Sequence, residues 1–251
     1  MTPVAPRIAL PRAPRLYERH ATAADRGVWS VERDVRWAEV DVAAARRTPD
    51  ILAAMRDACL IEAVHPANLG SLLPLVLDDV DACAVLSLEM YEGFKHFHAL
   101  RTYLDRVGFE PAITDHDIAA ARLAPDPHAD LPLVERLVEF MLSEHLAVYF
   151  FRRLAERAED TVLVELLARI SADEVRHAQS ASDLLAKRIA ADHTLVPRVL
   201  DAAAGFQHFG ARAVGEVPVA MAGDPLAIRS FARRIERLCG VRLVDHLKAS
   251  L

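Results

Sequence analysis

The stretch ARISADEVRHAQSASDLL, residues 168–185, decides the fold of this chain. At the period of an α-helix, Glu174 and His177 fall on a stripe that is otherwise apolar. That stripe consists of Leu163, Leu167, Ile170, Glu174, His177, Ala181 and Leu184. An ionised glutamate is almost never buried unless something pairs with it. Since a Glu-x-x-His pair facing the interior of a helical bundle is a source of metal ligands, we expect further inward carboxylates on neighbouring helices.

A second inward carboxylate lies 30 residues earlier. In VERLVEFMLSEHLAVYFFRRLAER, residues 134–157, the apolar stripe is interrupted by Glu144. The stripe consists of Leu137, Met141, Glu144, Val148 and Phe151. A single glutamate on one helix, followed by Glu-x-x-His on the next, supplies half of the ligands of a two-metal site in a four-helix bundle.

The other half is predicted nearer the N-terminus. Residues 48–66, TPDILAAMRDACLIEAVHP, open with Thr48 as N-cap and Pro49 at the first helical position. Their apolar stripe ends in Glu62, the counterpart of Glu144. The next predicted helix, residues 80–108, carries Glu89, Glu92, His96 and His98. Because Glu62 precedes Glu92 by the same 30 residues that separate Glu144 from Glu174, we predict an internal repeat of two helix pairs.

The repeat is imperfect at one position. Laying YEGFKH, residues 91–96, on ADEVRH, residues 172–177, pairs His96 with His177, Lys95 with Arg176, Glu92 with Asp173 and Gly93 with Glu174. The carboxylate expected at residue 93 is therefore missing.

Two local arrangements could replace that carboxylate. A one-residue π-bulge between Glu92 and His96 would bring Glu92 into the ligand position. Alternatively, Glu89, one turn earlier on the same stripe, could reach past Gly93, which has no obstructing side chain. In that case Glu92, like Asp173, would orient the histidine of the opposite helix. The sequence leaves both alternatives open.

These motifs carry a resemblance to a known superfamily. SADEVRH, residues 171–177, is very similar to the second metal-binding motif of acyl-carrier-protein desaturases, and EGFKHFHALRTYL, residues 92–104, follows their first motif apart from Gly93. EAVHP, residues 62–66, and WSVERDVRW, residues 29–37, also resemble segments of such proteins. Over residues 29–210 the chain resembles the oxygen-activating branch of the ferritin-like di-iron carboxylate superfamily, which includes desaturases, bacterial monooxygenase hydroxylases and the small subunit of ribonucleotide reductase.

The resemblance implies an all-α fold: a ferritin-like four-helix bundle with a long crossover between helices two and three and additional C-terminal helices. It also implies two iron ions, or a manganese–iron pair, with O2 as co-substrate. The candidate metal ligands are Glu62, Glu89, Glu92, His96, Glu144, Glu174 and His177. The expected reaction is hydroxylation, desaturation or N-oxygenation of a small or carrier-protein-bound substrate.

Electrons for such a reaction are expected from outside the chain. The sequence has no Gly-x-Gly-x-x-Gly motif and no cysteine cluster for an iron–sulfur centre, so a ferredoxin, a reductase or the substrate itself must supply them. The alternative is a non-catalytic bundle, metal-binding or metal-free, that serves as a scaffold or partner subunit. The loss of a carboxylate at Gly93 is the feature that favours this alternative.

Composition restricts the class of protein. With 251 residues, 53% of them hydrophobic, and only 9 glycines, the chain is long enough for one large helical domain. A net charge of −6 argues against a general nucleic-acid binder. Cys59, Cys83 and Cys239 lack Cys-x-x-Cys spacing and are predicted to be packed thiols. No apolar run has the length of a membrane span or signal peptide, so we expect a cytoplasmic location and no membrane partner. A homodimer is compatible with the sequence.

The domain organisation follows from these segments. Residues 1–28 are predicted as an extended N-terminal tail and residues 29–251 as a single ferritin-like helical domain. The Pro- and Asp-bearing stretch 108–132 supplies the crossover. Residues 193–210 and 224–247 are predicted as two helices that pack on the bundle and close one wall of the site.

Several other polar residues have no assigned role. His65, His98 and His145 show no partner at ligand spacing and are interpreted as structural or supporting histidines. Tyr91, Tyr103 and Tyr149 could lie near the metals, and the sequence does not distinguish a core tyrosine from a radical-bearing one. The catalytic residues beyond the metal ligands are unknown at this stage.

Overall fold

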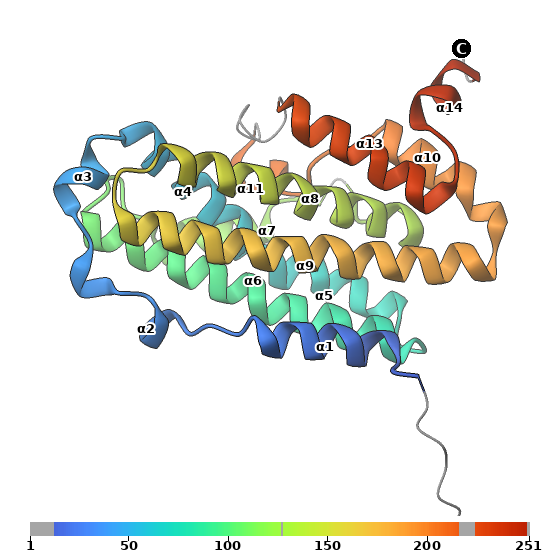
Figure 1. Cartoon of the computed structure of the whole chain (residues 1–251), viewed down its shortest axis with the longest axis horizontal. Coiled ribbons are helices and arrows are strands. Elements are labelled where there is room, and N and C mark those ends of the chain that lie inside the picture. The colour runs from blue at the N-terminus through green and yellow to red at the C-terminus, as the bar shows by residue number, and fades with distance from the viewer. Residues whose placement is uncertain (1–12, 127, 216–223, 250–251) are drawn as a thin grey trace, which may run out of the picture.

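Four long helices form the centre of the computed structural model, which describes residues 13–126, 128–215 and 224–249 (Figure 1). They are α4 (Pro49–Ala63), α6 (Val80–Val107), α8 (Leu133–Arg157) and α9 (Thr161–Ala191). α4 packs closely on α6, and α8 on α9. The two helix pairs predicted from the repeat are therefore present, and the all-α fold is confirmed. The described residues contain no β-strand.

Shorter helices surround these four. They are α1 (Leu16–Arg26), α2 (Val31–Asp34), α3 (Val42–Arg46), α5 (His65–Leu72), α7 (Asp115–Leu123), α10 (Val196–Ala204), α11 (Ala211–Val214), α13 (Pro225–Cys239) and α14 (Leu243–Ala249), with 3₁₀ turns at Trp37–Glu39, Leu73–Leu75 and His193–Leu195. Among the described residues, no helix combines the length and the apolar composition that a membrane span requires.

Local sequence signals fix the ends of the long helices. The Asp79 carboxylate accepts hydrogen bonds from the backbone N–H groups of Asp81 and Ala82 at the start of α6. That helix ends at Gly108, whose φ of 62° is the left-handed conformation that favours glycine. Only residues 158–160 connect α8 to α9, so these two helices are antiparallel neighbours.

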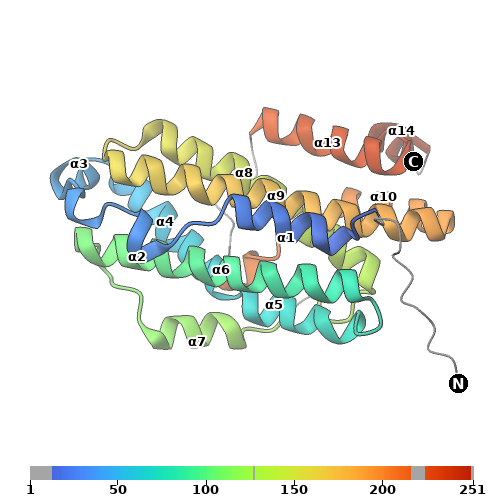
Figure 2. The same ribbon diagram turned by 60° about the horizontal axis from the view of Figure 1, so that its bottom comes forward.

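The long crossover runs from α6 to α8 and contains α7 (Figure 2). The Asp126 carboxylate lies 3.6 Å from the Arg136 guanidinium and attaches the crossover to α8. The C-terminal segment returns to the bundle, with α10 and α13 packed on α8, and α11 on α4. These placements agree with the predicted crossover and C-terminal helices.

The predicted extended tail over residues 1–28 is wrong for part of its length. Leu16–Arg26 is helix α1, which lies along α6 and α9 (Figure 2), while residues 1–12 fall outside the described part of the chain. His20 Nε2 lies 3.0 Å from an Asp183 carboxylate oxygen. Only Ala24 of this helix is buried, while Leu16 and Tyr17 pack partly buried against the hydrophobic core.

The hydrophobic core is divided in two by a polar layer. On α9 the apolar residues up to Ile170 belong to one cluster and those from Ala181 onward to another. On α8 the same division falls between Leu142 and Ala147. The glutamates and histidines singled out in the sequence lie in the gap between the two clusters.

A buried carboxylate, Asp160, joins three segments at one end of the bundle. Its oxygens accept hydrogen bonds from the Tyr103 hydroxyl at 2.8 Å, the Leu163 N–H at 3.1 Å and the Asp41 N–H at 3.1 Å. Asp160 precedes Glu174 by 14 residues, or about 21 Å along a helix with a rise of about 1.5 Å per residue. Tyr103 is therefore a structural residue of this end and not a neighbour of Glu174.

We predict that Tyr103→Phe lowers the free energy of unfolding by about 1 kcal/mol, the usual net contribution of one buried hydrogen bond. Urea denaturation followed by circular dichroism measures the change. Tyr91→Phe is the matched control, because Tyr91 lies on the same helix and is 64% exposed. Equal midpoints for wild type and Tyr103→Phe would show that the Asp160 network does not contribute to stability.

Candidate metal centre

Five side chains from the four long helices meet at the polar layer. Glu62, His96 and Glu174 offer ligand atoms within 4.8 Å of one another, and Glu144, Glu174 and His177 form a second such group. Each of the five side chains is at most 4% exposed. Glu174 belongs to both groups: Oε1 lies 2.9 Å from His96 Nδ1, and Oε2 lies 3.0 Å from His177 Nδ1. Its carboxylate therefore has the position of a bridge.

Both histidines are oriented from behind by a carboxylate of the opposite helix. His96 Nε2 lies 3.0 Å from Asp173 Oδ2, and His177 Nε2 lies 3.0 Å from Glu92 Oε2. These contacts fix the rings so that both Nδ1 atoms face the centre. Metal-binding histidines are commonly held in this way, through the ring nitrogen that does not bind the metal.

Cationic and indole groups hold the two orienting carboxylates. Asp173 accepts a hydrogen bond from Trp29 Nε1 at 2.8 Å and pairs with Lys95 Nζ at 2.8 Å. Glu92 accepts a hydrogen bond from Arg176 Nη2 at 2.7 Å. Glu92 and Asp173 thus have equivalent surroundings on the two sides of the centre, as the internal repeat requires.

The helix that carries Glu92 is a continuous α-helix from Val80 to Val107. The π-bulge alternative is therefore not found, and Glu92 remains behind His177. The second alternative is found only in part: Glu92 lies behind His177 as it requires, but the His65 ring occupies the space beside Gly93 past which Glu89 was to reach. Glu89 Oε2 lies 3.5 Å from His177 Nδ1, and the other oxygen accepts a hydrogen bond from Ser180. Burial raises the pKa of Glu89 to about 7.

His65 is also part of the centre, and its interpretation as a histidine without a partner at ligand spacing is wrong. Its Nδ1 lies 2.9 Å from Glu62 Oε2, and its Nε2 lies 3.3 Å from Glu144 Oε1. The signal was present in the sequence, because Glu62 and His65 are themselves a Glu-x-x-His pair. His98 and His145 lie elsewhere: His98 contacts Glu32 at the surface, and His145 Nδ1 accepts a hydrogen bond from Arg234.

Several buried atoms at the centre have no hydrogen-bond partner. They are Glu62 Oε2, His65 Nδ1, Glu89 Oε2, His96 Nδ1 and Glu174 Oε1. Nitrogen and oxygen atoms here face one another at ion-pair distance without the alignment of a hydrogen bond. Buried polar atoms are nearly always hydrogen-bonded, and those that are not call for an explanation such as an ion. The mixed carboxylate and imidazole donors fit divalent iron or manganese.

Without a cation, protonated histidines balance the carboxylates. Burial opposes ionisation of Glu62, but His65 and His96 lower its pKa to about 2. Burial likewise opposes protonation of His65, whose pKa Glu62 and Glu144 raise to about 10. The pKa of His177 is raised against the effect of burial, mainly by Glu89 and Glu174. Since a histidine must lose the proton from the nitrogen that binds a metal, metal binding here would release protons.

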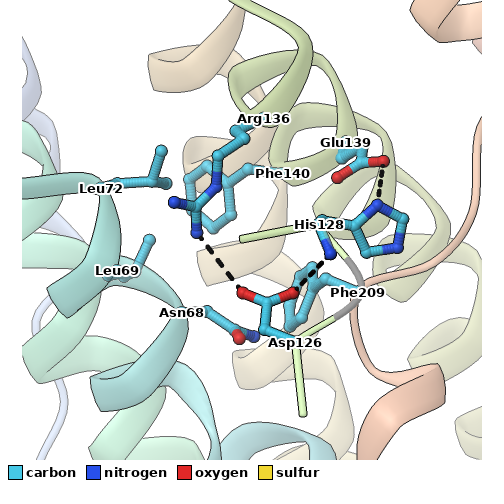
Figure 3. A pocket seen from close by; sticks show the side chains of 9 residues that line it. All are labelled: Asn68, Leu69, Leu72, Asp126, His128, Arg136, Glu139, Phe140 and Phe209. Atoms are coloured by element: carbon cyan, nitrogen blue, oxygen red, sulfur yellow. Dashed lines mark hydrogen bonds and ion pairs between the residues drawn. The ribbon is translucent and has the colours of Figure 1, made fainter. Parts of the chain in front are cut away.

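One side of the centre borders a small cavity. Its wall includes Glu62, Glu144, Ser143, His208 and Phe209, and its volume is about 10 Å³. This is about the room that one water needs. Phe209 also lines a second cavity of about 30 Å³ under the crossover, shown in Figure 3 with Asp126, Arg136 and the His128–Glu139 pair. The Phe209 ring thus contributes to both cavities.

Comparison with known proteins supports the fold. No family model and no curated protein matches the chain. Among solved structures, it is similar to an R2-like ligand-binding oxidase from Sulfolobus acidocaldarius, with a TM-score of 0.63 over 92% of this chain and 93% of that chain. The sequences are 14% identical, so the likeness concerns the fold alone. The predicted ferritin-like helical fold is thereby confirmed.

We predict that ferrous iron or Mn²⁺, added without oxygen, stabilises the protein against heat. A metal that binds only the folded state adds about 2.7 kcal/mol at a free concentration 100 times its Kd. Glu174→Ala should abolish this stabilisation, because Glu174 contributes to both groups of donors. His145→Ala is the matched control, as a buried histidine outside the centre. If the melting temperature of the wild type is the same with added metal as with a chelator, the result argues against a metal centre.

Proposed function

We propose that this protein is an O2-dependent oxidase or oxygenase that uses two metal ions, iron with iron or manganese with iron. Glu62, His96 and Glu174 would hold the first ion. Glu144, His177 and Glu174 would hold the second, with Glu89 as a further carboxylate. The observation that carries the proposal is the Glu174 carboxylate, which presents one oxygen to each of two buried histidines.

When bound and reduced, the metal pair would supply the electrons that activate O2. The residues of the chain provide the surroundings that such chemistry needs. Apolar clusters on both sides keep bulk water away from the donors. Asp173 and Glu92 hold the imidazoles in place, so that little rearrangement accompanies a change of metal charge.

The cavity beside Glu62 and Glu144 suggests how the reactants would enter. Its volume accommodates a molecule the size of O2 or water but not an organic substrate. A small or carrier-bound organic substrate would therefore require movement of His208 and Phe209, which lie in the connection between α10 and α11. A separate ferredoxin or reductase, or the substrate, would deliver the electrons.

A second function has one specific observation in its favour. The neighbouring carboxylates raise the pKa values of His65, His96 and His177, so protonated imidazoles would offset part of the buried negative charge without a metal. The protein would then be a metal-free or inactive bundle that acts as a scaffold. This alternative predicts that the protein is stable without metal and that, mixed with ferrous iron, it consumes O2 no faster than free iron does.

We predict that the ferrous protein consumes O2 faster than the same concentration of free iron. The experiment loads the protein with two equivalents of ferrous iron without oxygen, mixes it rapidly with O2, and records O2 uptake and near-ultraviolet absorbance. The rate of O2 uptake should fall at least about 10-fold in Glu174→Ala, the scale of loss seen when a group that supports a metal is removed. In His145→Ala the rate should stay at the wild-type level. Uptake equal to that of free iron would support the scaffold instead.

A further inference from the structure

The room of the missing carboxylate on α6 is filled by another side chain. A Cβ atom added to Gly93 would lie 2.3 Å from His65 Nδ1, 2.6 Å from its Cγ and 3.0 Å from its Cβ. Real side chains never approach so closely, so a residue larger than glycine at position 93 would exclude the His65 ring. Glycine at position 93 therefore makes the room that the His65 ring occupies.

A break in the helix places His65 in this room. α4 ends at Ala63, and α5 begins at His65 with Pro66 beside it. Proline has no backbone N–H, so residue 66 cannot donate to the Glu62 carbonyl and continue the first helix. The chain bends at Val64 and directs the His65 ring toward Gly93 of α6. The ring is 2% exposed.

The Nδ1 atom of His65 faces an inward carboxylate, as in His96 and His177, but its Nε2 contacts Glu144, which is itself a carboxylate of the centre. In His96 and His177, Nδ1 faces the inward carboxylates and Nε2 contacts a carboxylate behind the ring. In His65, Nδ1 faces Glu62 and Nε2 contacts Glu144 Oε1 at 3.3 Å. Such a contact leaves the Nδ1 lone pair available to a metal.

The unpartnered atoms identify which ion His65 would serve. Glu62 Oε2 lies between two imidazoles, 2.9 Å from His65 Nδ1 and 3.6 Å from His96 Nδ1. None of these three buried atoms has a hydrogen-bond partner. Glu62 Oε2 thus stands between the two imidazole nitrogens, on the side of the centre that has no carboxylate at residue 93. His65 is not among the donors that lie within 4.8 Å of one another, so an ion bound to both imidazoles would draw the His65 ring inward.

We infer that His65 is a metal ligand of the first ion and replaces the carboxylate absent at Gly93. The inference rests on the metal centre of the proposed function. It gives the centre three imidazoles, from His65, His96 and His177. Because a neutral imidazole takes the place of a carboxylate, the site carries one negative charge fewer. Imidazole suits iron better than manganese, whereas carboxylate suits manganese, so the first position should favour iron.

Equilibrium dialysis with ferrous iron in the absence of oxygen tests the ligand. Wild type should bind two ions, and His65→Ala should bind one of them at least about 10-fold more weakly, the scale on which loss of a group at a metal site acts. Gly93→Glu alone should also bind weakly, because its side chain and His65 compete for the same room. The double variant His65→Ala/Gly93→Glu should again bind two ions, and its first position should bind Mn²⁺ more tightly than the wild-type position does.

A spectroscopic measurement counts the histidines directly. In the protein loaded with Co²⁺, the N–H proton of each cobalt-bound imidazole gives a strongly shifted proton NMR signal that disappears in D2O. Three such signals are expected in wild type, two in His65→Ala, and three in the control His145→Ala. The wild-type count decides the matter even if His65→Ala fails to fold.

The outcomes separate this inference from the proposed function. A wild-type protein that binds no metal overturns both. A wild-type protein that binds two ions but shows two shifted signals, with unchanged dialysis in His65→Ala, overturns only the role of His65. Binding of two ions by the double variant, together with three signals in wild type, supports it.

Discussion

The structure depends on the burial of several carboxylates and imidazoles at one point inside an apolar bundle. Removing one partner of a buried charged pair typically costs 3–5 kcal/mol, because the remaining charge has no compensation. Here the charges are arranged in a closed set, with Glu174 at the middle and a histidine on either side. Hydrophobic clusters above and below this set stabilise the bundle and offset the cost of burying its charges. The polar layer is therefore best explained by function.

The groups behind the centre explain why its donors have fixed positions. His96 and His177 each have their outer nitrogen held by a carboxylate, and each carboxylate is held in turn by cationic side chains. Lys95 also lies 4.5 Å from the centre of the Trp29 ring, which anchors the segment before α2 to the same network. Contacts that begin at the outside of the bundle thus fix the positions of the central donor atoms.

Much of this arrangement could be predicted from the sequence because an α-helix has a regular period. Glu62, Glu144 and Glu174 interrupt apolar stripes, and helical geometry alone brings such residues to a common interior. The sequence also contained a signal for one of the two roles considered for Glu92. Its alignment with Asp173 places it one residue before the ligand position, where a carboxylate orients the histidine of the opposite helix. Two features could not be read from helical period. α1 buries few apolar side chains, and His65 owes its position to a break between helices that the period does not describe.

The internal repeat explains why the loss of a glutamate at position 93 is compatible with a metal centre. Each half of the bundle contributes a glutamate from its first helix and a histidine from its second, and Glu174 is shared. In the first half, the imidazole of His65, at the start of α5, occupies the space beside Gly93. The second half gains Glu89, whose free oxygen faces His177. Carboxylate and imidazole donors are therefore divided unequally between the two candidate metal positions. The two positions should differ in charge and in the metal they prefer.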